Sequence, residues 1–175
     1  MSEPLIHPDI TKAHTLPSRF YTDEESFQIL MADMRNCWYF GAHASQFAEH
    51  NLIPLIDIEA MLGEALILTN SDKIRCLSNV CTHRGMLVAT ESNNRNTLQC
   101  KYHGRTFGMD GCLKNMPEFQ DVEGFPSASD NLPGFPITEW KGLQLVGGDR
   151  YLKEAIAELQ SRLGWLDVAS FKHDK

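Results

Sequence analysis

Two short boxes in the middle of the chain each combine one cysteine with one histidine. The first reads CTHRG and supplies Cys81 and His83, and the second reads CKYHG and supplies Cys100 and His103. Thiolate and imidazole are ligands for metals of intermediate softness. These four donors suit either a tetrahedral zinc ion, or a two-iron, two-sulfur cluster with two cysteines on one iron and two histidines on the other.

The order of the donors separates these two occupants. Zinc modules generally place cysteine with cysteine and histidine with histidine, because each half is one knuckle or one helix face. Here each box holds one donor of each kind, so each loop would contact both metals of a two-iron unit. Gly85 and Gly104 follow the donors closely. Glycine lets peptide N–H groups approach the inorganic sulfurs, whose negative charge must be offset.

The two boxes together closely resemble those of the Rieske family, and specifically its ring-hydroxylating and related oxygenase branch. The resemblance covers nearly the whole chain, including "NVCTHRG", "YHGRTFGMDGCLKNMPEF" and "GFPSASDNLPGFPITEWKGLQLV". It implies a mainly β fold of antiparallel sheets with a small cluster-binding subdomain, plus an N-terminal and a C-terminal helix. It also implies a Rieske-type 2Fe-2S cluster on Cys81, His83, Cys100 and His103, surrounded by Arg84, Gly85, Tyr102, Gly104 and Arg105.

The sequence departs from other branches of the family near the boxes. The cytochrome bc-type proteins have an additional cysteine in each box and a serine after His-Gly; here Met86 or its neighbours, Tyr102 and Arg105 occupy those places. Fewer hydrogen bonds to the cluster predict a reduction potential near the low end of about −150 to +300 mV. Many oxygenases carry tryptophan where this chain has Arg105, which indicates different packing over the cluster or a different docking surface.

The resemblance implies a role in electron transfer. Rieske dioxygenases and monooxygenases pass electrons from a ferredoxin or flavin reductase through the cluster to a mononuclear iron. Their reactions include aromatic ring hydroxylation. That iron is held by two histidines and a carboxylate in a separate catalytic domain. After His103 this chain has only His173, so that site is not encoded here. We expect a piece of an oxygenase alpha subunit; a stand-alone Rieske-type ferredoxin and, less favoured, a structural Cys2His2 zinc protein remain alternatives.

Family members of full length are homotrimers in which the cluster of one subunit faces the mononuclear iron of its neighbour. By this resemblance His103 is expected to be the electron exit, because the Tyr-His-Gly box is the more exposed one. The substrate depends on the catalytic domain and is left open by the sequence.

The bulk properties exclude other classes. The formal net charge is −7 and basic residues form no cluster, so neither nucleic acid nor a membrane surface is an expected partner. The amino end lacks the apolar run of a secretory signal, which predicts a cytoplasmic protein. An odd number of cysteines argues against a disulfide framework. We expect three of them to be packed in the core or partly buried, namely Cys37, Cys76 and Cys112.

The elements around the boxes can be predicted from local patterns. A helix is expected over 22–34, with Thr22 and Glu25 as a capping box and an apolar stripe facing the core, formed by Phe27, Leu30, Met31 and Met34. Short apolar runs from 37 to about 98 predict antiparallel strands. Asp110-Gly111 predicts a two-residue hairpin turn, and a second amphipathic helix is expected to begin at Asp149.

These elements suggest three regions. Residues 1–40 form a lead-in segment with a helix. Residues 41–148 form the Rieske domain, with cluster-binding loops over about 79–110 and an irregular, proline-rich loop over 115–136. Residues 149–175 form a helix and tail leading toward a catalytic domain absent from this chain.

Overall fold

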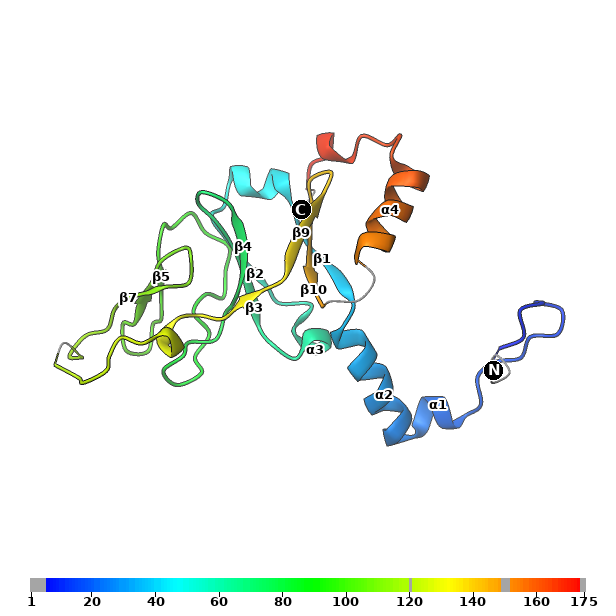
Figure 1. Cartoon of the computed structure of the whole chain (residues 1–175), viewed down its shortest axis with the longest axis horizontal. Coiled ribbons are helices and arrows are strands. Elements are labelled where there is room, and N and C mark those ends of the chain that lie inside the picture. Colours follow the sequence, from blue (N-terminus) through cyan, green and yellow to red (C-terminus); the bar gives the residue numbers. More distant parts are fainter. Residues whose placement is uncertain (1–5, 120, 149–151, 174–175) are drawn as a thin grey trace. The chain divides into compact units, whose positions relative to one another are not determined.

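The computed structural model describes residues 6–119, 121–148 and 152–173. The chain divides into two compact units, Met1–Met34 and Arg35–Lys175 (Figure 1). The expected helix start at Asp149 lies outside the described residues. Among the described helices, none has the length and apolar character needed to cross a membrane.

The predicted helix over 22–34 is two helices, α1 (Arg19–Thr22) and α2 (Glu24–Arg35). The predicted Thr22–Glu25 capping box was wrong, because Asp23 caps α2: its Oδ2 accepts the N–H of Ser26 at 2.9 Å and the hydroxyl of Ser26 at 3.0 Å. The backbone N–H of Asp23 donates to the carbonyl of Arg19 at the end of α1, and its side chain caps the start of α2.

The prediction that the apolar stripe of α2 lies in the core was also wrong. Phe27 is 51% exposed and Leu30 is 56% exposed, and α2 has no buried residue. Helical spacing determines which side chains share a face, but burial requires a packing partner. The four-residue α1 offers too little surface to bury this face.

The described strands of the second unit form three antiparallel sheets (Figure 1). The first has the order β1-β10-β9, comprising Trp38–His43, Leu143–Gly147 and Ile137–Trp140. The second has the order β2-β3-β4-β8, comprising Leu52–Leu55, Leu66–Asn70, Ile74–Ser78 and Gly134–Phe135. The third has the order β5-β6-β7, comprising Leu98–Gln99, Thr106–Phe107 and Leu113–Asn115.

Short helical segments connect or flank these strands. They are η1 (Ala44–Ala48), α3 (Glu59–Leu62), η2 (Ala128–Asp130), α4 (Leu152–Leu163) and η3 (Val168–Ser170). Antiparallel sheets with a helix near each end confirm the predicted fold class.

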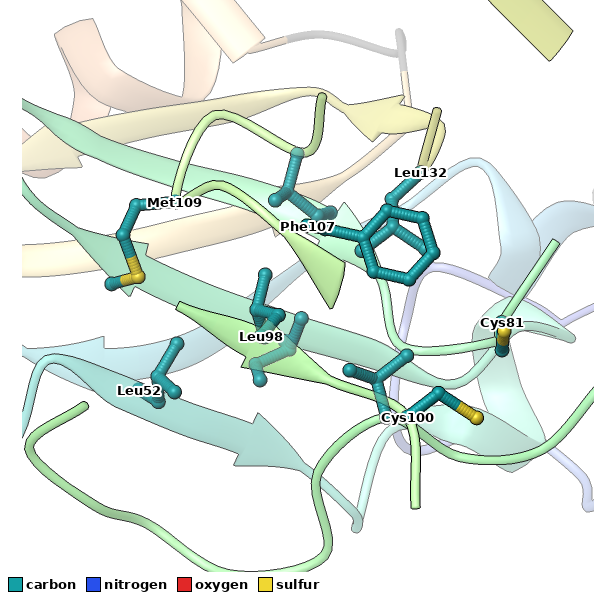
Figure 2. Close-up of a cluster of buried hydrophobic side chains, with 10 residues drawn as sticks. Leu52, Cys81, Leu98, Cys100, Phe107, Met109 and Leu132 are labelled. Carbon is teal, nitrogen blue, oxygen red and sulfur yellow. The ribbon is translucent and has the colours of Figure 1, made fainter. Parts of the chain in front are cut away.

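The sheet β2-β3-β4-β8 contributes side chains to a core on each of its faces, which explains the apolar run of Leu66, Ile67 and Leu68 in β3. Side chains alternate between the faces of a strand. Accordingly, Leu66 and Leu68 of β3 pack in one core, with Ala42 of β1 and Val146 of β10, whereas Ile67 packs in the other. The second core also contains Leu52, Leu77, Cys81, Val88, Leu98, Cys100, Phe107, Met109 and Leu132. Figure 2 shows Cys81 and Cys100 on the side of this core away from Met109.

The hairpin predicted at Asp110-Gly111 is present, with a longer loop than expected. Strands β6 and β7 pair across Gly108–Cys112, where the N–H of Gly111 donates to the carbonyl of Gly108 at 3.0 Å. Gly111 has φ +83° but Asp110 is not in the positive-φ region. The turn therefore needs one glycine rather than two consecutive residues with positive φ.

The three remaining cysteines differ in their burial. Cys76 is buried in the core and Cys112 is half-buried, as expected, but Cys37 is exposed. The expectation for Cys37 was wrong because this residue precedes β1 rather than lying within the strand.

Candidate metal centre

The two boxes fold into the same turn. In the first, the N–H of Gly85 donates to the carbonyl of Cys81 at 3.0 Å, and the N–H of Cys81 donates to the carbonyl of Met86 at 2.8 Å. In the second, the N–H of Gly104 donates to the carbonyl of Cys100 at 3.1 Å, and the N–H of Cys100 donates to the carbonyl of Arg105 at 2.9 Å. In each turn the cysteine thus accepts a hydrogen bond from the glycine and donates one to the residue that follows the glycine.

Glycine is required at equivalent places in both turns. Gly85 has φ +71° and Gly104 has φ +76°, a region that other residues enter only with strain. A Cβ on Gly85 would meet no neighbouring atom within 4 Å, whereas one on Gly104 would lie 3.2 Å from Cγ of Pro117. The first glycine is needed for its backbone conformation alone, and the second also for space.

The sulfur donors form one pair. Cys81 and Cys100 are each 2% exposed and pack in the same hydrophobic core. Burial raises the pKa of the Cys81 thiol, and the neighbouring Cys100 thiol acts in the same direction. The peptide N–H of His83 and the guanidinium of Arg105 oppose this rise, because both favour a negative sulfur.

The imidazole donors form a second pair. The rings of His83 and His103 have centroids 4.8 Å apart with planes inclined at 71°. Partial burial lowers the pKa of His83, and the positive charges of His103, Arg105 and Arg84 lower it further. A lowered pKa favours the neutral imidazole, which is the form that binds metals.

The two pairs suit two metals better than one. Tetrahedral zinc needs four donors on one ion, whereas a two-iron cluster asks for only two protein donors at each iron. Two cysteines and two histidines, one of each on each turn, therefore fit the donor set of the two-iron cluster.

The residues predicted around the donors occupy different environments. Arg84 and Gly85 are exposed, and no carboxylate among the described residues forms an ion pair with Arg84. Tyr102 is 56% exposed and its ring lies 3.8 Å from that of His103, centroid to centroid. Arg105 is 3% exposed, so it changes the packing near the donors and does not form a docking surface.

The proline-rich loop supplies residues that the sequence did not single out. The ring of Phe119 lies 6.2 Å from that of His83, and the ring of Phe125 lies 5.2 Å from that of Phe119, between centroids. Asp130 pairs with Arg105 at 3.0 Å. The sequence signal for this ion pair was Arg105 itself, because a cation buried next to metal ligands needs a counterion.

Comparison with known proteins identifies the family of this fold and site. The family model described as "Rieske [2Fe-2S] domain" matches residues 37–126. The oxygenase subunit of carnitine monooxygenase from Escherichia coli (strain K12) is 32% identical over 142 residues, which are 79% of this chain and 37% of that protein. Chloroplastic choline monooxygenase from Spinacia oleracea is 27% identical over 155 residues, 87% of this chain and 34% of that protein.

A solved structure agrees with these relatives. A quaternary ammonium Rieske monooxygenase, described for carnitine oxidation and inter-subunit electron transfer, has a TM-score of 0.75 and 27% identity over 87% of this chain and 43% of its own. The chain thus spans less than half the length of each of these proteins. Because the family model covers both boxes and half of the residues, and because the paired donors suit the cluster, this chain belongs to the Rieske [2Fe-2S] domain family.

Proposed function

We propose that Cys81 and Cys100 bind one iron of the 2Fe-2S cluster, that His83 and His103 bind the other, and that the domain relays electrons within an oxygenase. The observation that carries this proposal is that two turns of the same form each hold one buried cysteine, with the rings of His83 and His103 4.8 Å apart between centroids. When bound, the cluster supplies a reversible one-electron acceptor. The buried cysteines keep water from the sulfur side, and the two loops fix the spacing of the donors.

His103 is the proposed electron exit. It is exposed whereas His83 is half-buried, and the exposed Tyr102 ring lies against it. An electron leaving through the imidazole of His103 would therefore reach a docked partner without crossing the protein interior. The proposed partners are a ferredoxin or flavin reductase as donor and an oxygenase catalytic domain, on the same or a neighbouring subunit of a homotrimer, as acceptor.

A quaternary amine is the proposed substrate of the parent oxygenase. Both relatives are named for carnitine or choline, and the solved structure is that of a quaternary ammonium monooxygenase. These comparisons do not support the expectation of aromatic ring hydroxylation. They also favour an oxygenase over a stand-alone carrier, because the oxygenase relatives match 79% and 87% of this chain.

The cluster assignment can be tested on the purified chain. We expect a reddish-brown protein with two irons and two acid-labile sulfides per chain. Cys81→Ser and His83→Ala should each lose the iron. The matched controls Cys112→Ser and His173→Ala should keep it, because these residues lie outside the boxes. A colourless protein with one zinc per chain, or iron retained in Cys81→Ser, would refute the assignment.

The electron exit and the substrate need separate tests. In a reconstituted oxygenase, Tyr102→Ala should keep the cluster but slow transfer to the mononuclear iron, and an unchanged rate would refute exit through His103. Product formation from choline, carnitine and naphthalene, followed by mass spectrometry, should occur only with a quaternary amine. Turnover of naphthalene alone would refute the substrate proposal.

A further inference from the structure

Arg105 joins the two cluster loops. Its carbonyl accepts the N–H of Cys100 at 2.9 Å in the second box, and its Nη1 donates to Oγ1 of Thr82 at 2.7 Å in the first. Thr82 lies between Cys81 and His83. A single residue thus holds the backbone of one loop and the side chain of the other.

Arg105 also joins both loops to the proline-rich loop. Its Nη2 donates to Oδ1 of Asp130 at 3.0 Å, and its Nε contacts Sδ of Met116 at 3.2 Å. The hydroxyl of Thr82 donates in turn to the carbonyl of Asp130 at 2.7 Å. The guanidinium carbon lies 5.6 Å from the ring centroid of Phe125. Arg105, Thr82 and Asp130 therefore form a closed triangle of hydrogen bonds.

The triangle contains a buried cation and its counterion. Arg105 is 3% exposed, while the side chain of Asp130 is 20% exposed and also accepts the N–H of Ser127 at 2.8 Å and its hydroxyl at 2.9 Å. A charge in this environment is weakly screened by solvent. One-electron reduction adds a negative charge to the cluster, so a nearby fixed cation favours the reduced state and a nearby anion disfavours it.

We propose that Arg105 is a positioning residue that fastens the first cluster loop to the proline-rich loop, and that its charge raises the reduction potential of the cluster while Asp130 partly offsets it. This inference rests on the proposed ligand set. The low potential expected from the missing hydrogen-bond donors is thereby partly compensated by a charge at the position where many family members carry tryptophan.

Four variants of the 175-residue chain distinguish the effect of the Arg105 charge on the reduction potential from the effect of its hydrogen bonds on stability. Arg105→Met removes the cation at similar length, Arg105→Lys keeps it, Asp130→Asn removes the anion while keeping an acceptor oxygen, and Thr82→Val removes only the hydroxyl. The midpoint potential is measured by dithionite titration followed in the visible spectrum. Iron content and thermal unfolding are measured on the same samples.

We expect Arg105→Met to lower the equilibrium constant for one-electron reduction about tenfold, which is about 59 mV, and Asp130→Asn to raise it. Arg105→Lys should keep most of the reduction potential of the unmodified chain, but its melting temperature should be lower. Thr82→Val should lower the melting temperature with little change in potential. Loss of the triangle alone would move Arg105→Met and Asp130→Asn in the same direction, so opposite shifts identify the charge effect.

Two results would overturn the inference. One is a shift of the same sign in Arg105→Met and Asp130→Asn, and the other is an unchanged potential in Asp130→Asn. If Arg105→Met does not retain iron, the sign of the shift in Asp130→Asn decides alone. Failure of the ligand assignment is recognised separately, because the unmodified chain would then lack the cluster.

Discussion

Gly85 and Gly104 give a direct test of the two equivalent turns. Both have positive φ, so replacement by alanine should cost about 1–2 kcal/mol of folding free energy in each. Gly104→Ala should cost more, because its Cβ would lie 3.2 Å from Pro117. Gly134→Ala is the control, since Gly134 has open space and no positive φ. Urea unfolding measures the three values, and equal stability of Gly104→Ala and Gly134→Ala would contradict the assignment.

Two cysteines outside the boxes should differ strongly in reactivity. Burial raises the pKa of Cys76 to about 12, and the side chain is 2% exposed, whereas Cys37 is exposed. The thiolate is the reactive form, so iodoacetamide at pH 8 should modify Cys76 at least about 100-fold more slowly than Cys37. Peptide mass spectrometry over time measures both rates. Comparable rates in the folded protein would show that Cys76 is accessible and would contradict its place in the core.

Asp130 should make part of the stability depend on acid pH. The N–H and hydroxyl of Ser127, followed by Arg105, hold the pKa of Asp130 below its ordinary value, against the opposing effect of burial. A depressed carboxyl pKa stabilises the fold above the unfolded value of about 3.9, and this contribution is lost as pH falls through the folded pKa. The melting temperature of the unmodified chain should therefore exceed that of Asp130→Asn at pH 6.

The difference in melting temperature between the unmodified chain and Asp130→Asn should disappear as the pH is lowered below about 4. Loss of the cluster in acid affects both proteins alike, so the difference in melting temperature isolates Asp130. A difference in melting temperature that stays constant down to pH 2 would mean that the charge of the Asp130 carboxylate does not stabilise the fold.

At the scale of elements, substitutions on the two faces of β3 should distinguish an effect on folding stability alone from an effect that also includes retention of the cluster. Leu68 and Ile67 are both fully buried, but only Ile67 shares a core with Cys81 and Cys100. Leu68→Ala and Ile67→Ala should each cost about 2–5 kcal/mol of folding free energy. Only Ile67→Ala should also shorten the half-life of the visible cluster absorption. Equal half-lives in the two variants would show that the cores do not act separately.

The sequence predicted elements well where a pattern was local. The short apolar runs of β1, β3, β4, β9 and β10 identified strands, because pleated strands bury a short apolar segment whatever lies beyond it. The recurrence of one donor pattern likewise indicated two equivalent turns, which the structure has, and the set of four ligands proposed on them stays a prediction. Both features depend on residues close together in sequence.

The predictions failed where the outcome depended on a distant partner. The stripe of α2 has the spacing of a core helix but remains exposed. Asp130 pairs with Arg105, 25 residues away in the sequence, and no periodic pattern marks a contact of that kind. Tertiary contacts of loops depend on the path of the backbone, which local propensity does not specify.

At the scale of the whole molecule, the chemistry is confined to one of the two compact units. The four proposed ligands, both hydrophobic cores and the contacts of Arg105 all lie in Arg35–Lys175. A domain with its own core can fold independently. The helices α1 and α2 contribute no buried residue to either core.

Removal of residues 1–34 should therefore leave a folded, cluster-binding protein. We expect the shortened chain to keep two irons, the visible spectrum and a melting temperature within about 4 °C of the full chain, since a loss of under about 1 kcal/mol corresponds to that shift in a domain of this size. Differential scanning calorimetry and iron analysis test both properties. Removal of 164–175 is the contrasting deletion, because it takes away the carbonyl of Leu166 that accepts Nζ of Lys141 at 2.9 Å and the buried Val168. It should lower the melting temperature more than removal of 1–34, and the reverse order would contradict independent folding of the second unit.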